Sequence, residues 1–127
     1  MRVSRCACGE CSVEVEDDRV RSGLCNCDAC RRRTGAPFSW SVYFPNHQVR
    51  TVEGPFSIRL VESGEFAPHS RHFCSRCGST LYWNAGALTG FTGGCFNDPT
   101  LIAPRRVARY SQRMPWAAIP TSCEIDA

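Results

Sequence analysis

The spacing of the cysteines constrains this chain more than any other feature of its sequence. Ten cysteines occur in 127 residues, and seven of them stand in the short groups CACG, CNCDAC and CSRC. Disulfide frameworks scatter their cysteines so that Cα atoms can lie about 4.4–6.8 Å apart across loops. Tight CxC and CxxC groups without a secretion signal typify metal ligands in a reducing compartment. We therefore favour metal ligation over a disulfide framework, which the even number of cysteines would also allow.

The group CSRCG has the form of a zinc knuckle, in which two sulfur atoms bind one ion from a tight turn. Its glycine, Gly78, lets backbone N–H groups approach the sulfur atoms. A closed tetrahedral site needs four ligands, and the group CACG near the N-terminus offers two more. We predict a structural zinc ion bound by Cys6, Cys8, Cys74 and Cys77.

The group CNCDAC leaves Cys25, Cys27 and Cys30 as a compact trio. A zinc ion with three protein ligands keeps a fourth position for substrate or water, as catalytic zinc sites do. Three thiolates also make the ion electron-rich, so it would accept an incoming thiol and keep it deprotonated near neutral pH. The trio therefore predicts an open zinc site, and the chain as a whole predicts two zinc ions.

The sequence leaves alternatives for this trio. Cys95, Cys11 or a histidine could close the site and make it a second structural zinc, or Cys95 could complete an iron–sulfur cluster. Cys11 alternates with Val13 and Val15, which predicts a small residue on the buried face of a strand rather than a ligand.

Three arginines follow the trio directly. A zinc ion with three thiolates carries a net charge of −1, so Arg31, Arg32 and Arg33 can offset it and attract a carboxylate-bearing ligand. We expect Arg31, Arg32 and Gly35 to contact a thiol ligand. The same run of arginines could instead be a solvated face of a helical turn that caps the segment.

Net charge gives little support to nucleic-acid binding. The formal charge is +3, and all 15 basic residues are arginine. Seven thiolates and two Zn²⁺ ions together add −3, which brings the total to zero and makes nucleic acid an unlikely partner. No apolar run approaches the roughly 18 residues that span a bilayer, and no signal peptide is expected. We expect one domain over residues 1–127, located in the cytoplasm.

Strand patterns dominate the rest of the chain. Apolar residues alternate over 11–16 and 38–44, and 56–63 and 79–86 are also strand-like. The stretch 91–99 predicts a strand that ends in an Asn-Asp-Pro turn. No window of a dozen residues keeps a helical period, and CRRRTGAP predicts at most a helical turn. We predict a mainly β fold with short antiparallel sheets, followed by a loose terminus that carries Cys123 as a free thiol.

Five ordered stretches, CACG, CNCDACRRRTG, FCSRCGSTLYW, GCFNDP and RMPW, resemble the glutathione-dependent formaldehyde-activating enzyme family. They run from about residue 5 to residue 117, nearly the full chain. The resemblance implies a zinc-bearing β-tent fold with the same division into a structural zinc and an activity-associated zinc. It also implies addition of the glutathione thiol to formaldehyde, which is a carbon–sulfur lyase reaction in the reverse sense.

Two functional hypotheses follow. In the first, the chain is a zinc-dependent carbon–sulfur lyase-like enzyme that adds glutathione or a similar thiol to formaldehyde or a related small aldehyde. In the second, it is a non-catalytic zinc-binding module that carries a thiol or a metal, or binds a protein partner. Cys95 bears on both, because it stands where the family more often has an apolar or small hydroxyl residue and could fill the open position.

Overall fold

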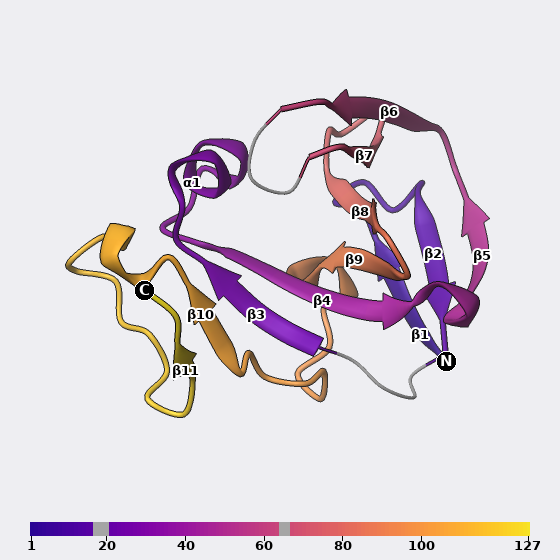
Figure 1. The fold of residues 1–127 in the computed structure, drawn as a ribbon. Coiled ribbons are helices and arrows are strands. Elements are labelled where there is room, and N and C mark those ends of the chain that lie inside the picture. The colour runs from indigo at the N-terminus through magenta and orange to yellow at the C-terminus, as the bar shows by residue number, and fades with distance from the viewer. Residues whose placement is uncertain (17–20, 64–66) are drawn as a thin grey trace.

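The computed structural model describes residues 1–16, 21–63 and 67–127, and it confirms the mainly β fold (Figure 1). Strands are short, and the α-helix that the described residues form has seven residues. In chain order the elements are β1 (Arg2–Arg5), β2 (Ser12–Val15), β3 (Arg21–Cys25), α1 (Asp28–Thr34), β4 (Ser39–Pro45), η1 (Asn46–Gln48), β5 (Val49–Glu53), β6 (Phe56–Val61), β7 (His69–Cys74), β8 (Thr80–Ala85), β9 (Leu88–Thr92), η2 (Gly93–Phe96), β10 (Arg106–Ala108), η3 (Tyr110–Gln112) and β11 (Glu124–Ile125).

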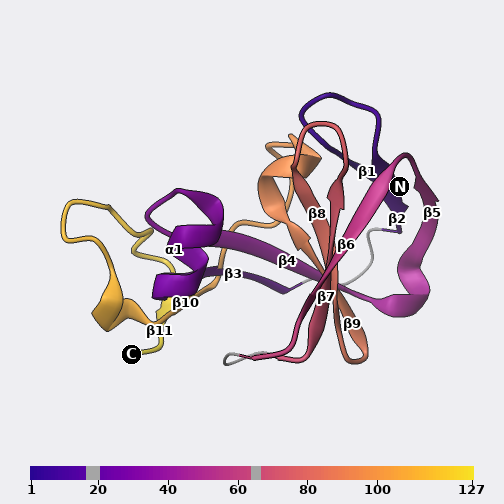
Figure 2. The same cartoon turned by 90° about the horizontal axis from the view of Figure 1, so that it is seen from above.

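Two sheets build the fold, and Figure 2 shows them from above. The smaller one has the order β1-β2-β5, and the larger one β11-β10-β3-β4-β9-β8-β7-β6. Their apolar faces share one core, in which Val13 and Val15 of β2 join Val42 and Phe44 of β4 and Phe91 of β9. The alternation read from residues 11–16 is thus confirmed, because its apolar positions are fully buried. In the stretch 38–44, Val42 and Phe44 are fully buried, whereas Phe38 and Trp40 are partly buried.

The opposite face of the large sheet carries aromatic rings, an arginine and a glycine. Register places Arg71 of β7 opposite Trp83 of β8, Trp83 opposite Gly90 of β9, and Gly90 opposite Tyr43 of β4. Directly opposed residues of antiparallel strands point to the same side of a sheet. A Cβ atom at Gly90 would lie 2.3 Å from Trp83 Nε1, so the indole ring lies across this glycine. Helix α1 lies on this side of the sheet, because Arg33 contacts the Trp83 ring.

The C-terminal segment is not loose, so that part of the prediction is wrong. Strand β11 pairs in parallel with β10, which itself pairs in parallel with β3. The amide of Glu124 donates to the carbonyl of Arg105 over 2.7 Å. Cys123 is a free thiol, as predicted, but it is buried against Leu24 and Val107. Burial of this apolar cluster explains why the terminus returns to the sheet.

The segment after β9 also differs from its prediction. The strand expected over 91–99 ends at Thr92, and Gly93–Phe96 forms a 3-10 helix instead. A Cβ atom at Gly93 would lie 2.3 Å from the Trp40 ring, so a bulky indole group occupies the space beside the chain. The expected turn follows at Asp98, whose Oδ1 accepts a hydrogen bond from the Thr100 amide over 2.9 Å. No helix in the described ranges has the length and apolar character needed to cross a membrane.

Candidate metal centres

The first group of sulfur atoms joins the N-terminal turn to the turn between β7 and β8. Cys6 and Cys8 follow β1, Cys74 ends β7, and Cys77 stands in the turn before β8. Figure 2 shows these two turns close to each other at the same end of the molecule. Their four Sγ atoms all lie within 4.8 Å of one another, and we call this group the quartet. Residues that are distant in sequence thus form one compact set of four sulfur donors.

Backbone amides of the two turns point at the quartet sulfurs. The Cys11 amide donates to Cys6 Sγ over 3.2 Å, and the Arg76 amide donates to Cys74 Sγ over 3.4 Å. Both turns close on a glycine with positive φ, 83° at Gly9 and 81° at Gly78. An L side chain rarely adopts this conformation, so glycine permits the tight turn that presents these amides. Such N–H groups stabilise negative charge on sulfur.

Side chains also connect the two turns of the quartet. The Arg76 guanidinium group forms an ion pair with Glu10, and Ser79 Oγ accepts a hydrogen bond from the Ala7 amide over 3.1 Å. The hydrogen bond from Ser79 lowers the pKa of the exposed Cys77 thiol to about 5, so this sulfur is a thiolate at neutral pH. The quartet therefore has the donor set, and part of the charge, that a thiophilic divalent ion requires.

The second group, which we call the trio, is built by one short segment. Cys25 ends β3, Cys27 caps the N-terminus of α1, and Cys30 lies in its first turn; their Sγ atoms lie within 4.8 Å of one another. The Cys30 amide donates to Cys27 Sγ over 3.3 Å. Asn26, which stands between Cys25 and Cys27, is fully buried. It donates to the Ala108 carbonyl from its backbone amide over 3.1 Å and from Nδ2 over 3.2 Å. The CxC segment is thus fixed on β10.

Interactions within the trio lower the pKa of one of its thiols and raise the pKa of another. The hydrogen bond between Cys25 and Cys30 lowers the pKa of Cys30 to about 4 and raises the pKa of Cys25. Burial opposes the shift at Cys30, whereas a hydrogen bond from Ser39 and the charge of Arg33 favour it. At neutral pH the trio therefore holds a thiolate next to a positive charge. The negative charge of this thiolate favours binding of a metal cation, but three sulfur ligands do not complete a tetrahedral site.

No fourth ligand from the described residues joins the trio. Within those ranges, no other cysteine, histidine, aspartate or glutamate offers a ligand atom within 4.8 Å of all three sulfurs. Cys95 donates instead to the Thr80 carbonyl over 3.7 Å, and its charged neighbours are Cys6 and Cys77. Cys11 is buried in the core beside the quartet, as predicted. His72 stacks on Tyr82 with 4.2 Å between ring centroids. The alternatives that close the trio with these residues are therefore not supported.

Three residues near the trio were missed by sequence reasoning. Arg71 and Tyr43 interact electrostatically with Cys30, and Trp83 contacts both of them. They come from β7, β4 and β8, so they meet only through the register of the large sheet. The sequence signal for this group was weak, because Arg71 stands between Ser70 and His72 in a largely polar stretch.

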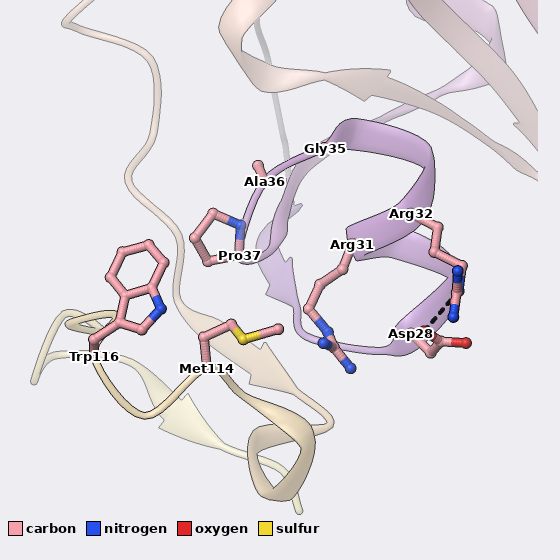
Figure 3. A pocket seen from close by; sticks show the side chains of 8 residues that line it. All are labelled: Asp28, Arg31, Arg32, Gly35, Ala36, Pro37, Met114 and Trp116. Carbon is pink, nitrogen blue, oxygen red and sulfur yellow. Dashed lines mark hydrogen bonds and ion pairs between the residues drawn. The ribbon is translucent and has the colours of Figure 1, made fainter.

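The expected contact residues Arg31, Arg32 and Gly35 line a pocket of about 450 Å³ (Figure 3). This pocket lies between one face of α1 and the C-terminal residues Met114 and Trp116. Figure 3 shows Arg32 paired with Asp28, over 2.9 Å between Nε and Oδ1. The three trio cysteines do not line this pocket. The charge of Arg33, the third of these consecutive arginines, contributes to the lowered pKa of Cys30.

These observations define a mainly β protein with two separate cysteine clusters that are suited to bind metal. A family model described as "Glutathione-dependent formaldehyde-activating enzyme" matches residues 1–113, and the chain belongs to this family. A curated protein of Fusarium vanettenii that carries the same family name is 34% identical over 80 residues, which cover 61% of this chain and 42% of that protein. The chain thus matches less than half the length of that relative.

A solved structure supports the same fold. The crystal structure of a Rhodobacter sphaeroides protein, determined by a structural genomics programme, is similar to this chain with a TM-score of 0.59. The match covers 80% of this chain and 91% of that protein, at 19% sequence identity. At this level of identity the likeness concerns the fold alone.

Proposed function

We propose that the chain is a zinc-dependent carbon–sulfur lyase-like enzyme that adds glutathione or a similar thiol to formaldehyde or a related small aldehyde. The observation that carries this proposal is the trio, which offers three sulfur donors without a fourth ligand from the described residues. Membership of the family supports the thiol and the aldehyde as substrate classes. The β-tent architecture and the single-domain organisation of residues 1–127 belong to the same proposal.

The donor sets of both clusters fit zinc. Four thiol sulfurs in the quartet match a closed structural site, and three in the trio match a site with one exchangeable position. We propose that Cys6, Cys8, Cys74 and Cys77 hold the first zinc ion and that Cys25, Cys27 and Cys30 hold the second. When bound at the trio, zinc would lower the pKa of an incoming thiol, so that the thiol is a nucleophile near neutral pH.

The chain's own residues hold the trio ready for this chemistry. Asn26 fixes the CxC segment on β10, and the Cys27 cap fixes the start of α1. Ser39 and Arg33 stabilise negative charge at Cys30. In the reaction the substrate sulfur forms a bond to the carbonyl carbon, and the carbonyl oxygen takes the π electron pair and a proton. The thiol loses one proton and the oxygen gains one, so the product is a hemithioacetal, and no redox partner is required.

The pocket beside α1 gives the rest of the thiol ligand a place to bind. Arg31, Arg32 and Gly35 line it together with Trp116 and with Asp28, the residue that follows the Cys27 cap. We propose that these residues contact the peptide part of glutathione. A reducing location, the cytoplasm, is part of the proposal, because all ten cysteines are free thiols.

The test is the rate of thiol addition measured by exchange NMR with ¹³C-formaldehyde and glutathione. Protein loaded with two zinc ions should accelerate formation of S-hydroxymethylglutathione above the uncatalysed rate, and Cys27→Ser should abolish the acceleration. If the loaded protein binds glutathione but gives no acceleration, the non-catalytic carrier is the correct function. If the loaded protein neither binds glutathione nor accelerates the reaction, the chain is instead a zinc-binding module that binds a protein partner.

A further inference from the structure

Two arginines from distant parts of the chain meet over one tryptophan on the side of the sheet that carries the trio. The Arg33 Cζ atom lies 5.8 Å from the centroid of the Trp83 ring, and the Arg71 Cζ atom lies 5.2 Å from it. Arg33 extends from α1 and Arg71 from β7. Their charges are close enough that each acts on Cys30 of the trio. Both guanidinium groups therefore border the space where a ligand of the trio would lie.

The tryptophan that carries them is held in place. Its indole ring is buried and lies across Gly90, where a Cβ atom would overlap it. The Tyr43 ring packs against the same indole ring in a T-shaped arrangement, with 6.1 Å between centroids and an interplanar angle of 85°. A ring fixed in this way orients the two guanidinium groups, since arginine stacks on aromatic faces. The pair is thus a prearranged feature of the fold and not two mobile surface side chains.

The described part of the chain offers these two arginines no carboxylate partner. Among the residues described by the structure, no aspartate or glutamate forms an ion pair with Arg33 or Arg71. The Nη1 atom of Arg71 is buried and has no hydrogen-bond partner there. Burial, with a smaller contribution from Arg33, lowers the pKa of Arg71 to about 10. A buried donor and two adjacent like charges are unfavourable unless an anion accompanies them.

The trio alone does not balance this positive charge. Three thiolates with one Zn²⁺ ion carry −1, and the two guanidinium groups carry +2, so a surplus of +1 remains. Tyr43 does not remove it, because burial raises the pKa of its hydroxyl group, which stays neutral. A coordinated thiolate offsets this surplus, but it does not supply the hydrogen-bond acceptor that the buried Nη1 atom of Arg71 lacks. A guanidinium fork matches a carboxylate with two parallel hydrogen bonds, so a carboxylate is the anion that fits best.

We propose that Arg33 and Arg71 bind a carboxylate of the thiol substrate and thereby select carboxylate-bearing thiols over neutral ones. This proposal rests on the proposed function, because it takes the substrate to be a thiol bound at the trio. It adds a specificity-determining pair to the site, on a face of α1 different from that of Arg31 and Arg32. Arg71 and Arg33 orient the substrate, and they do not take part in bond formation.

The test is a binding measurement on protein that holds two zinc ions, with calorimetry of glutathione and of 2-mercaptoethanol. Arg71→Gln should weaken glutathione binding by about 10- to 100-fold, the range of a lost charged hydrogen bond, and leave 2-mercaptoethanol binding unchanged. Arg33→Gln should act in the same direction. Arg50→Gln is the matched control, because it removes the same charge from an exposed ion pair on β5 and should change neither affinity.

Two amides of glutathione identify which carboxylate binds. One carries the glycine carboxylate as a neutral amide, and the other carries the γ-glutamyl α-carboxylate as a neutral amide. The analogue that lacks the bound carboxylate should bind the wild type as weakly as glutathione binds Arg71→Gln. Its affinity for Arg71→Gln should equal its affinity for the wild type. If Arg71→Gln does not fold, Arg33→Gln alone decides, since its side chain is on the surface helix and is only half-buried.

The outcomes separate the two proposals. Equal losses for glutathione and 2-mercaptoethanol, with zinc retained, would mean that the arginines only balance the charge of the trio, and would overturn the carboxylate site. Glutathione binding that is unchanged in both arginine variants would overturn it as well, while the proposed function stands. A zinc-loaded wild type that binds no thiol would overturn the proposed function together with this inference.

Discussion

The quartet and the trio use the same ligand in two different structural settings. The quartet ties the turn after β1 to the turn after β7, and backbone amides of both turns donate to its sulfurs. The trio is contained in a short segment around the start of α1, and arginine and serine side chains from other elements surround it. A cluster that joins distant segments stabilises the fold, whereas a local cluster that depends on neighbouring charges is free to serve a ligand.

The largest effect should come from Cys77→Ser. This side chain is exposed, so serine cannot disturb packing, and any loss of structure reports the loss of a metal ligand. Structural zinc sites contribute about 10–16 kcal/mol in small domains, which equals the whole stability of many. We expect loss of near-UV circular dichroism at 25 °C and less than one zinc per chain. A folded variant with unchanged melting temperature would contradict a structural role for the quartet.

Gly90→Ala tests whether the position of the Trp83 ring orients Arg33 and Arg71 beside the trio. The added Cβ atom would lie 2.3 Å from the Trp83 ring and force this ring away from β9. Overpacking of this kind costs about 1–3 kcal/mol, which urea unfolding can measure. Both zinc ions should remain, but glutathione affinity should fall because Arg33 and Arg71 lose their common support. Unchanged tryptophan fluorescence and unchanged affinity would show that the ring does not orient the pair.

Cys27→Ser and Cys27→Ala separate two roles of one residue. Serine is a good N-cap, so Cys27→Ser should lose one zinc per chain and keep the helix and the fold. Cys27→Ala removes the cap as well and should cost about 1 kcal/mol more in unfolding free energy. Elemental analysis and urea unfolding of the two variants give the comparison. If Cys27→Ser unfolds as Cys77→Ser does, the trio is structural too.

Acid release of zinc should show the smallest effects. The Ser79 hydrogen bond lowers the folded pKa of Cys77, so its contribution is present above the unfolded pKa of about 8.5 and is lost as pH falls through about 5. Ser79→Ala raises that pKa, so protons displace the quartet zinc at higher pH, by less than about one unit. Ser39→Ala should shift release from the trio in the same direction. A chromogenic chelator measures zinc release from both clusters as pH falls. If Ser79→Ala shifted release from the trio, or Ser39→Ala shifted release from the quartet, the assignment of each serine to its cluster would be wrong.

Sequence spacing was sufficient to group the sulfurs, because CxC and CxxC bring ligands together through local geometry. Strands such as β2 and β4 were predictable from their alternation, since one face of each is buried. The neighbours of the trio were not, because Arg71, Trp83 and Tyr43 meet only through pairing between distant strands. The two-residue strand β11 was missed for a similar reason, because its order depends on burial of Cys123 against β3 and β10.

Zinc K-edge X-ray absorption of the loaded protein, recorded with and without glutathione, tests the division between the clusters most directly. Two zinc ions per chain are expected, one with four sulfur ligands and one with three and a lighter fourth ligand. Glutathione should raise the average to four sulfurs per zinc, and Cys27→Ser should abolish that change. Four sulfurs on every zinc before glutathione is added, or a single zinc ion per chain, would contradict an open site at the trio.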